Sequence, residues 1–174
     1  AAKESGPVRL LLSAHGLPKK IIDRGDPYQW QVEKTCEAVV AALADKGFSG
    51  LDWQVCYQSR VGPLEWIGPA TEDAIIDAGR DGRGVVLAPI AFVSEHSETL
   101  VELDIDYREL AEKNGLSHYA RVPTVGTNKE FIEGLAIIVR KALRWDDRVA
   151  RCGVGDGARC CLRQFHGCGH GTVP

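Results

Sequence analysis

The sequence predicts an α/β fold in which an open, mostly parallel sheet of about four strands is flanked by helices. Three observations predict it: short apolar runs alternate with longer amphipathic segments, Gly and Pro mark many junctions, and 174 residues fit one ordinary domain. With 44% hydrophobic residues the chain can bury a single core. We expect one α/β domain over residues 1–145, followed by a Gly- and Cys-rich tail over residues 146–174.

Composition limits the classes of protein to which the chain can belong. Its formal net charge is −3 and its Lys and Arg residues are scattered, which argues against a nucleic-acid-binding protein. No apolar run has the length that crosses a bilayer, and no signal peptide precedes the first strand. We therefore expect a cytoplasmic protein, with contact at a membrane surface left open. The chain contains no Met, so we also expect it to be part of a longer polypeptide.

The first part of the chain predicts one strand and one helix. Residues 8–14 form a nearly continuous apolar run that is typical of a buried strand, and His15 stands directly beyond its carboxyl end. A polar loop over residues 18–27 leads into an amphipathic helix over about residues 28–46. Gly47 is the expected stop of that helix.

The middle of the chain predicts two more strands, over residues 51–57 and 85–92. The loop of residues 58–69 between them is rich in Gly and Pro and too long for a minimal connection. Loops of that length usually carry a function or lack order. A helix over about residues 70–78 is expected to end at Gly79.

The last part of the predicted domain holds a short fourth strand and a helix. The strand is residues 118–122. Thr127 and Glu130 have the spacing of a capping box, which opens the helix. One face of this helix holds Phe131, Leu135, Ile138, Val139 and Ala142.

Three polar clusters are predicted to meet at one edge of the sheet. In open parallel sheets, ligands bind outside the carboxyl ends of the strands. That rule brings together His15 after the first strand, the loop of residues 58–66 after the second and the acidic segment of residues 95–102 after the third. We expect the functional site at this edge.

The acidic segment has two interpretations. We expect it to begin a helix, because four apolar residues recur at helical spacing: Leu100, Leu103, Tyr107 and Leu110. On that helix Glu98, Glu102 and Asp106 are four apart, with Glu95 one turn earlier. A solvated acidic face is the simpler interpretation. The other is a metal site, because His96, with Glu98 and Glu102, offers imidazole and carboxylate ligands that suit a divalent metal such as iron.

His15 can be structural or catalytic. A neutral imidazole takes a proton near neutral pH, and a nearby carboxylate such as Glu98 can hold a divalent cation or relay the proton. Leu17, Trp66 and Phe92 are apolar residues near the same strand ends, which either line a cleft for a flat hydrophobic ligand or belong to the core.

Four motifs, in this order, resemble the carboxyl-terminal half of ferrochelatase. The resemblance covers about residues 8 to 143. The motifs are S-A-H-G-L-P at 13–18, R-G-D-P-Y at 24–28, Q-S-R-V-G-P-L-E-W at 58–66 and P-I-A-F-V-S-E-H-S-E-T-L-V-E-L-D at 89–104.

This resemblance implies the insertion of Fe²⁺ into protoporphyrin IX with release of two protons, the last step of haem synthesis. His15 matches the family's active-site histidine, a proton acceptor or metal ligand, and Glu98 matches the partner carboxylate across the porphyrin plane. Trp66 and Phe92 match aromatic residues near the porphyrin pocket. The resemblance also implies that His96, Glu102 and Asp104 lie on a helix with a π-type widening that carries protons or metal to or from the site. The metal-binding residues implied in this way are His15, His96, Glu98, Glu102 and Asp104.

The chain departs from the family in that only one of two similar lobes is present. The resemblance implies that the missing amino-terminal lobe of the same polypeptide is a partner, alongside porphyrin and ferrous iron. That lobe contributes much of the pocket wall and the membrane-facing lip, so the isolated chain is expected to be inactive or to require the rest of its polypeptide.

The cysteines fall into two groups. Cys36 and Cys56 are isolated and are expected to be buried free thiols. In some ferrochelatases a [2Fe-2S] cluster is bound by cysteines near the carboxyl terminus. Four cysteines of the tail could be such ligands, could bind zinc, or could belong to a tail without metal: Cys152, Cys160, Cys161 and Cys168.

Two other functions stay open at this point. One is a small homodimeric chelatase related to those of sirohaem and cobalamin synthesis, in which two copies of such a lobe form the cleft. The other is a non-catalytic metal-binding protein that uses the acidic helix without a porphyrin.

Overall fold

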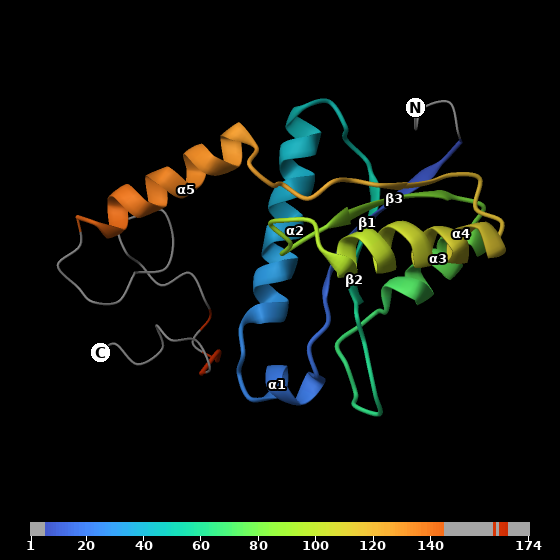
Figure 1. Cartoon of the computed structure of the whole chain (residues 1–174), viewed down its shortest axis with the longest axis horizontal. Helices are drawn as coiled ribbons and strands as arrows, with labels where there is room; N and C mark the ends of the chain where they lie inside the picture. The colour runs from blue at the N-terminus through green and yellow to red at the C-terminus, as the bar shows by residue number, and fades with distance from the viewer. Residues whose placement is uncertain (1–5, 145–161, 163, 167–174) are drawn as a thin grey trace.

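A computed structural model of the chain describes residues 6–144, 162 and 164–166. Four parallel strands form one sheet in the order β2-β1-β3-β4 (Figure 1). This confirms the predicted open parallel sheet. The strands are β1 (Val8–His15), β2 (Asp52–Gln58), β3 (Gly84–Pro89) and β4 (Tyr119–Arg121).

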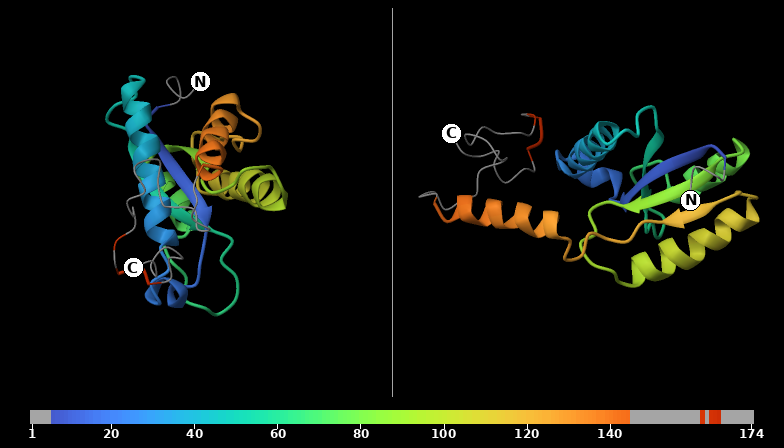
Figure 2. Two further views of the ribbon diagram at one scale, coloured as in Figure 1. Left: turned by 90° about the vertical axis from the view of Figure 1, so that its left-hand side faces the viewer. Right: turned by 90° about the horizontal axis from the view of Figure 1, so that it is seen from above.

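Helices cover both faces of the sheet, as predicted. Figure 2 shows α2 on one face and the α3–α4 layer on the other. The carboxyl-terminal helix α5 extends away from the sheet. The helices are α1 (Lys19–Asp23), α2 (Tyr28–Asp45), α3 (Thr71–Arg80), the π-helix η1 (Glu98–Asp106), α4 (Tyr107–Lys113) and α5 (Lys129–Ala142).

The central strand β1 contributes to two separate hydrophobic cores. Successive side chains of a strand point to opposite faces, so Leu11 packs with α3 and α4 while Leu12 packs with α2. Cys36 and Cys56 are buried free thiols, which confirms that prediction, and burial raises the pKa of both. Two-sided burial explains why β1 reads as a nearly continuous apolar run.

Several boundaries differ from those predicted. The predicted loop of residues 18–27 contains the short helix α1. Strand β3 ends at Pro89, because Ala91 takes a positive φ of 66° that an extended strand cannot hold. Gly79 does not stop α3 but lies inside it, where a Cβ would come within 2.8 Å of Asn114 O.

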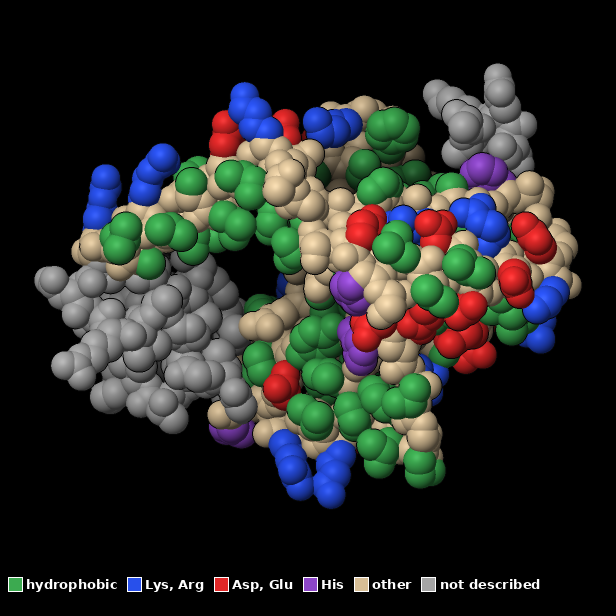
Figure 3. All heavy atoms as spheres, viewed as in Figure 1, with side chains coloured by type: hydrophobic (Ala, Val, Ile, Leu, Met, Phe, Trp, Pro, Cys, Tyr) green, Lys and Arg blue, Asp and Glu red, His purple; other side chains and the backbone are tan. Residues whose placement is uncertain are grey.

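Helix α5 does not pack on the sheet. Its amino-terminal cap is Asn128 rather than the predicted Thr127, because the Asn128 side chain accepts from two backbone amides. No residue of α5 is buried, and Figure 3 shows hydrophobic side chains exposed along the projecting helix. Its exposed apolar residues include Ile132, Leu135, Ile137, Ile138 and Val139.

Little of the predicted tail falls within the described residues. Phe165 packs against Trp30 of α2 with ring centroids 5.6 Å apart. The four tail cysteines, Cys152, Cys160, Cys161 and Cys168, lie outside the described residues. Across the helices that are described, none has the length and hydropathy to span a membrane.

Candidate active site

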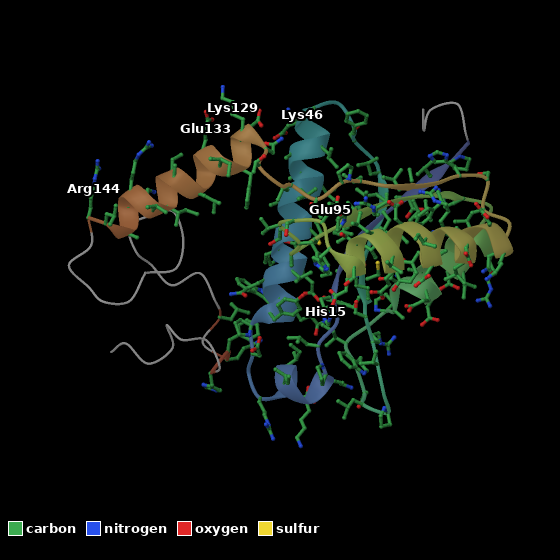
Figure 4. All side chains as sticks on the ribbon, in the orientation of Figure 1. His15, Lys46, Glu95, Lys129, Glu133 and Arg144 are labelled. Atoms are coloured by element: carbon green, nitrogen blue, oxygen red, sulfur yellow. The ribbon has the colours of Figure 1, made fainter. Side chains whose placement is uncertain are left out.

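The three predicted polar clusters meet at the carboxyl edge of the sheet. His15, the last residue of β1, is the sheet partner of Gln58, the last residue of β2. The segment after β3 enters η1, whose Glu98 and Glu102 approach His15 and the residue after Gln58 respectively. Figure 4 labels His15 at this edge and Glu95 just before η1, and Figure 3 shows histidine, acidic and hydrophobic side chains gathered at the middle of this face.

His15 is held in one orientation. Its Nδ1 lies 2.7 Å from Gly16 O, and the Tyr28 hydroxyl donates to His15 O at 2.8 Å. A carbonyl oxygen only accepts, so the proton of the neutral imidazole sits on Nδ1 and the lone pair on Nε2. Nε2 lies 3.9 Å from Glu98 Oε1, beyond hydrogen-bond length, and both side chains are about two-fifths exposed (41% and 40%).

The glycine after His15 allows the end of β2 and the loop that follows it to approach closely. A Cβ on Gly16 would lie 3.0 Å from Gln58 O and 3.3 Å from the Trp66 ring. The Gly16 amide donates to Gln58 O at 2.8 Å, and the Ile67 amide donates to Leu17 O. The loop after β2 is thereby fastened beside His15, which brings two predicted porphyrin contacts, Leu17 and Trp66, to this edge.

The acidic helix is a π-helix, as the family resemblance implies. Its wider turns change which side chains share a face. Leu103 and Tyr107 are buried as the helical spacing predicts, but Leu100 is 46% exposed, so its predicted place on the apolar face is wrong. The carboxylates of the helix also face different partners instead of forming one stripe.

Glu102 is tied to the end of β2. Its carboxylate accepts from the Ser59 amide at 2.8 Å, from the Ser59 hydroxyl at 2.5 Å and from the Tyr107 hydroxyl at 2.8 Å. Gln58 Nε2 approaches it at 3.4 Å. The Gln58 amide is turned that way because its Oε1 accepts from the buried Ser13 hydroxyl. Four donors thus hold the Glu102 carboxylate, which the sequence predicted to be either a metal ligand or part of a solvated face.

Glu95 and Asp104 are held by arginines from β4 and α4. Arg121 Nη1 donates to Glu95 Oε1 at 2.9 Å, and its Nη2 donates to Asp104 Oδ2 at 3.1 Å. Arg108 Nη2 donates to the other oxygen of Asp104 at 2.9 Å. Partial burial favours the neutral acid, but hydrogen bonds from Thr99 and Arg121 prevail and lower the pKa of Glu95 to about 2. Against the same effect of burial, Arg108 and Arg121 lower the pKa of Asp104.

Glu98 differs from these three carboxylates. Among the described residues its carboxylate has no hydrogen bond and only the approach to His15. Its backbone amide donates to His96 Nδ1 at 3.2 Å, so the neutral His96 ring carries its proton on Nε2, the opposite tautomer to His15. The Phe92 ring lies 5.2 Å from the His96 ring, which places the third predicted porphyrin contact next to η1.

The five predicted metal ligands are not gathered into one preformed metal site. Within the part of the chain that is described, no group of three or more His, Cys, Asp or Glu side chains is arranged to hold an ion. His15 and Glu98 form one pair, Glu102 is bound by donors from β2, and Asp104 is bound by two arginines. The described residues therefore bring His15 and Glu98 together and hold Glu102 and Asp104 on other partners.

Two cavities lie elsewhere on the molecule. One of about 490 Å³ is lined at the opposite edge of the sheet by Arg9 and by Asp52 and Asp81, each of which pairs with Arg9. The other, of about 410 Å³, is lined by Glu72 and Tyr107 among others. Neither is lined by His15 or Glu98, whose side chains are both accessible at the carboxyl edge of the sheet.

Sequence reasoning did not find Ser59, Tyr107 or Arg121. Ser59 stands inside a quoted motif and takes a positive φ of 58°, but nothing in its spacing links it to Glu102. Tyr107 was assigned to the core, where its ring lies, while its hydroxyl reaches Glu102. Arg121 stands at the end of a strand, where a basic residue is common, and nothing in the sequence links it to Glu95 or Asp104.

Comparison with known proteins assigns the chain to a family. The sequence pattern described as ferrochelatase matches residues 1–143. The chain belongs to the ferrochelatase family. It is 59% identical over 136 residues to ferrochelatase from Caulobacter vibrioides and 55% identical over 133 residues to that from Pelagibacter ubique. It is 50% identical over 160 residues to ferrochelatase from Rickettsia bellii.

These ferrochelatases are much longer than the chain. The alignment with the Caulobacter protein covers 78% of this chain and 38% of the relative, and that with the Pelagibacter protein covers 76% and 38%. The alignment with the Rickettsia protein covers 92% of this chain and 44% of the relative. In fold, the chain is similar to the crystal structure of a putative cobalamin biosynthesis CbiX protein from Marinobacter aquaeolei. That match has a TM-score of 0.56 at 16% identity and covers 79% of this chain and 98% of the other. It supports the chelatase-like α/β fold.

Proposed function

We propose that this chain is the carboxyl-terminal part of a ferrochelatase that inserts Fe²⁺ into protoporphyrin IX. The observation that carries the proposal is the approach of His15 Nε2 to Glu98 Oε1 at 3.9 Å, in a chain that belongs to this family. Both side chains are fastened through their backbones but accessible, as a pair that exchanges protons with a ligand must be.

Insertion of Fe²⁺ requires two pyrrole N–H protons to leave the porphyrin. His15 Nε2 carries a lone pair in the tautomer set by Gly16 O, so it is the proton acceptor in this proposal. The imidazolium that forms gains a partner in Glu98, whose carboxylate has no hydrogen bond among the described residues. Exchange of two protons for Fe²⁺, the second substrate, leaves the product uncharged at its centre.

We assign supporting roles to the other predicted site residues. Leu17, Trp66 and Phe92 contact the porphyrin, which fits their places beside His15 and His96. Glu102 and His96 lie next to Glu98 on the route by which protons or iron pass along η1. Both oxygens of Glu102 and of Asp104 are engaged, so Glu102 serves on that route only by giving up a donor and Asp104 only by giving up an arginine.

The remaining polypeptide completes the cleft in this proposal. Relatives are more than twice as long as the matched region, so a second lobe of comparable size accompanies this one. Helix α5 supports the proposal, because 14 residues with no buried side chain make a marginal helix unless a partner covers the apolar face. We assign the absent lobe of the same polypeptide to that face.

A peripheral membrane contact and a cytoplasmic location complete the assignment. Val61 and Leu64, at the tip of the loop after β2, are 71% and 59% exposed. The base of that loop adjoins the first residue of α1, because the Lys19 amide donates to Glu65 O. Apolar side chains beside lysines suit the headgroup region of an anionic bilayer. Binding of the full-length protein to anionic vesicles, weakened in Val61→Ser/Leu64→Ser, tests the contact.

We also propose that the tail cysteines bind a [2Fe-2S] cluster in the full-length protein. The proposal rests on the sequence alone, because Cys152, Cys160, Cys161 and Cys168 lie outside the described residues. A visible spectrum of the anaerobically isolated protein with the absorption of such a cluster, lost in Cys161→Ser, supports it. A colourless protein free of iron and sulfide contradicts it.

Anaerobic metal insertion tests the proposed function. Protoporphyrin IX is mixed with Fe²⁺ or Zn²⁺ and the Soret band is followed, with the full-length gene product and with this chain alone. We expect insertion by the full-length protein, loss of insertion in His15→Ala, and no change in Lys34→Ala, an exposed residue of α2. A full-length protein that inserts neither metal overturns the proposal.

A small homodimeric chelatase is the alternative that one observation favours. This single lobe matches the fold of the CbiX protein over 98% of the CbiX chain. Insertion by the isolated chain, together with a dimeric mass in size-exclusion chromatography, supports that alternative, and a monomer without activity excludes it.

A further inference from the structure

Arg121 spans the π-helix from outside. It is the last residue of β4, and its side chain is only 9% exposed. One guanidinium nitrogen bonds Glu95, which precedes η1, and the other bonds Asp104, which lies in its second half. A single side chain therefore connects the approach to the helix with its far part.

Each carboxylate of this clamp also accepts from a donor that does not reach the other carboxylate. Thr99, which is fully buried, donates to Glu95 Oε2 at 2.6 Å, and the Thr124 amide donates to Glu95 Oε1 at 3.0 Å. Arg108 holds the second oxygen of Asp104. The guanidinium is oriented toward the two carboxylates so fully that its Nε is buried without a partner among the described residues.

We interpret this clamp as a device that fixes the shape of η1 rather than one that stabilises the folded chain. The Arg121 side chain is largely buried, but those of Glu95 and Asp104 are 32% and 34% exposed, so solvent screens part of the attraction between the charges within each ion pair. A π-helix, however, is rare and concentrates at functional sites, where its wide turns place side chains that an α-helix cannot. Glu98 lies within the clamped span, between Glu95 and Asp104.

We propose that Arg121 is a positioning residue that holds the first turn of η1 so that Glu98 stays opposite His15. This inference rests on the proposed function, and it assigns to Arg121 no contact with substrate. Without the guanidinium, Glu95 and Asp104 lose their shared partner and repel Glu98, and the wide turn loses its brace.

The test compares turnover and local opening in the full-length protein. For Arg121→Met we expect kcat to fall by about 100-fold, the loss that a small misplacement of a reacting group produces, with KM for porphyrin within twofold of wild type. Arg121→Lys keeps the charge but cannot bridge two carboxylates, so we expect it to recover only part of the loss. Arg108→Met is the matched control, because Arg108 also pairs with Asp104 but not with Glu95. We expect its kcat within threefold of wild type.

A second readout does not depend on activity. Hydrogen exchange of residues 98–106 is expected to speed up in Arg121→Met and in Glu95→Gln, which opens the clamp from its other end, and to stay unchanged in Arg108→Met. If Arg121→Met does not fold, Glu95→Gln takes its place in both measurements. Unchanged exchange, or equal losses of kcat in the Arg121 and Arg108 variants, overturns the positioning role. A wild-type protein without metal insertion overturns the proposed function instead.

Discussion

Nε2 of His15 lies 3.9 Å from Oε1 of Glu98, with the imidazole lone pair on that nitrogen. The gap is too long for a hydrogen bond, so neither group is satisfied by the other until a proton arrives. An imidazole and a carboxylate that are held by the backbone but unpaired at their reactive atoms are prepared for a ligand. The surrounding carboxylates are instead bound by protein donors.

This contrast predicts the effect of Glu98→Gln in the full-length protein. The amide keeps the shape but loses the charge that stabilises the His15 imidazolium, so we expect kcat for metal insertion to fall by about 100-fold to 10,000-fold. Steady-state fluorescence of the metalloporphyrin product measures it. Glu37→Gln, in an exposed ion pair on α2, is the control and should leave kcat unchanged. Turnover of Glu98→Gln within threefold of wild type would remove Glu98 from the mechanism.

The Tyr107 hydroxyl is expected to matter for stability. It donates to the Glu102 carboxylate at 2.8 Å from a ring that is 3% exposed, and a hydrogen bond to a charged group contributes about 1.5–3 kcal/mol. Tyr107→Phe should therefore lower the free energy of unfolding of this chain by that amount, measured by urea denaturation. Thr35→Val removes an exposed hydrogen bond within α2 and should change it by less than about 0.5 kcal/mol. Equal changes in the free energy of unfolding of the two variants would show that the hydrogen bond to Glu102 stabilises the chain no more than an exposed one.

Acid unfolding should report on Glu95. Its pKa in the folded chain is about 2, below the ordinary value of 4.5, so its contribution to stability is present above pH 4.5 and is lost as the pH falls toward 2. The difference in thermal midpoint between wild type and Glu95→Gln should shrink over this interval. Glu109→Gln, at an exposed ion pair in α4, should show a smaller difference throughout. A gap between wild type and Glu95→Gln that stays constant from pH 5 to pH 2 contradicts the assignment.

The sequence predicts the sheet from short-range patterns, and those patterns together with the family resemblance predict the candidate pair of His15 and Glu98. The apolar run of β1 and the rule of strand ends place His15 at the functional edge, and the segment after β3 then supplies Glu98. These inferences need no knowledge of how distant side chains pack. The His15–Glu98 approach is the part of the candidate site that sequence reasoning recovers.

The rest of the site depends on contacts between distant segments. Leu100 is exposed because the segment forms a π-helix, whereas its spacing predicts a buried place on an α-helix. No local pattern in this segment distinguishes a π-helix from an α-helix. The bonds of Glu102 to Ser59 and of Glu95 to Arg121 join residues from different elements, whose side chains meet only after the sheet has formed. Of the acidic stripe that the spacing predicts, Glu95 and Glu102 are therefore bound by protein donors, Glu98 faces His15, and Asp106 is exposed.

Two glycines in helices should respond oppositely to the same substitution. Alanine favours a helix over glycine by about 1 kcal/mol, but at Gly79 its Cβ would lie 2.8 Å from both Asn114 O and Leu116 Cδ1. Backbone cannot yield cheaply, so we expect Gly79→Ala to lower the urea midpoint of this chain. At Gly134 in α5 no atom of another described segment lies within 4 Å of such a Cβ, so Gly134→Ala should increase helical circular dichroism without lowering the midpoint. A stabilised Gly79→Ala would mean that α3 and the turn after α4 do not approach as closely as described.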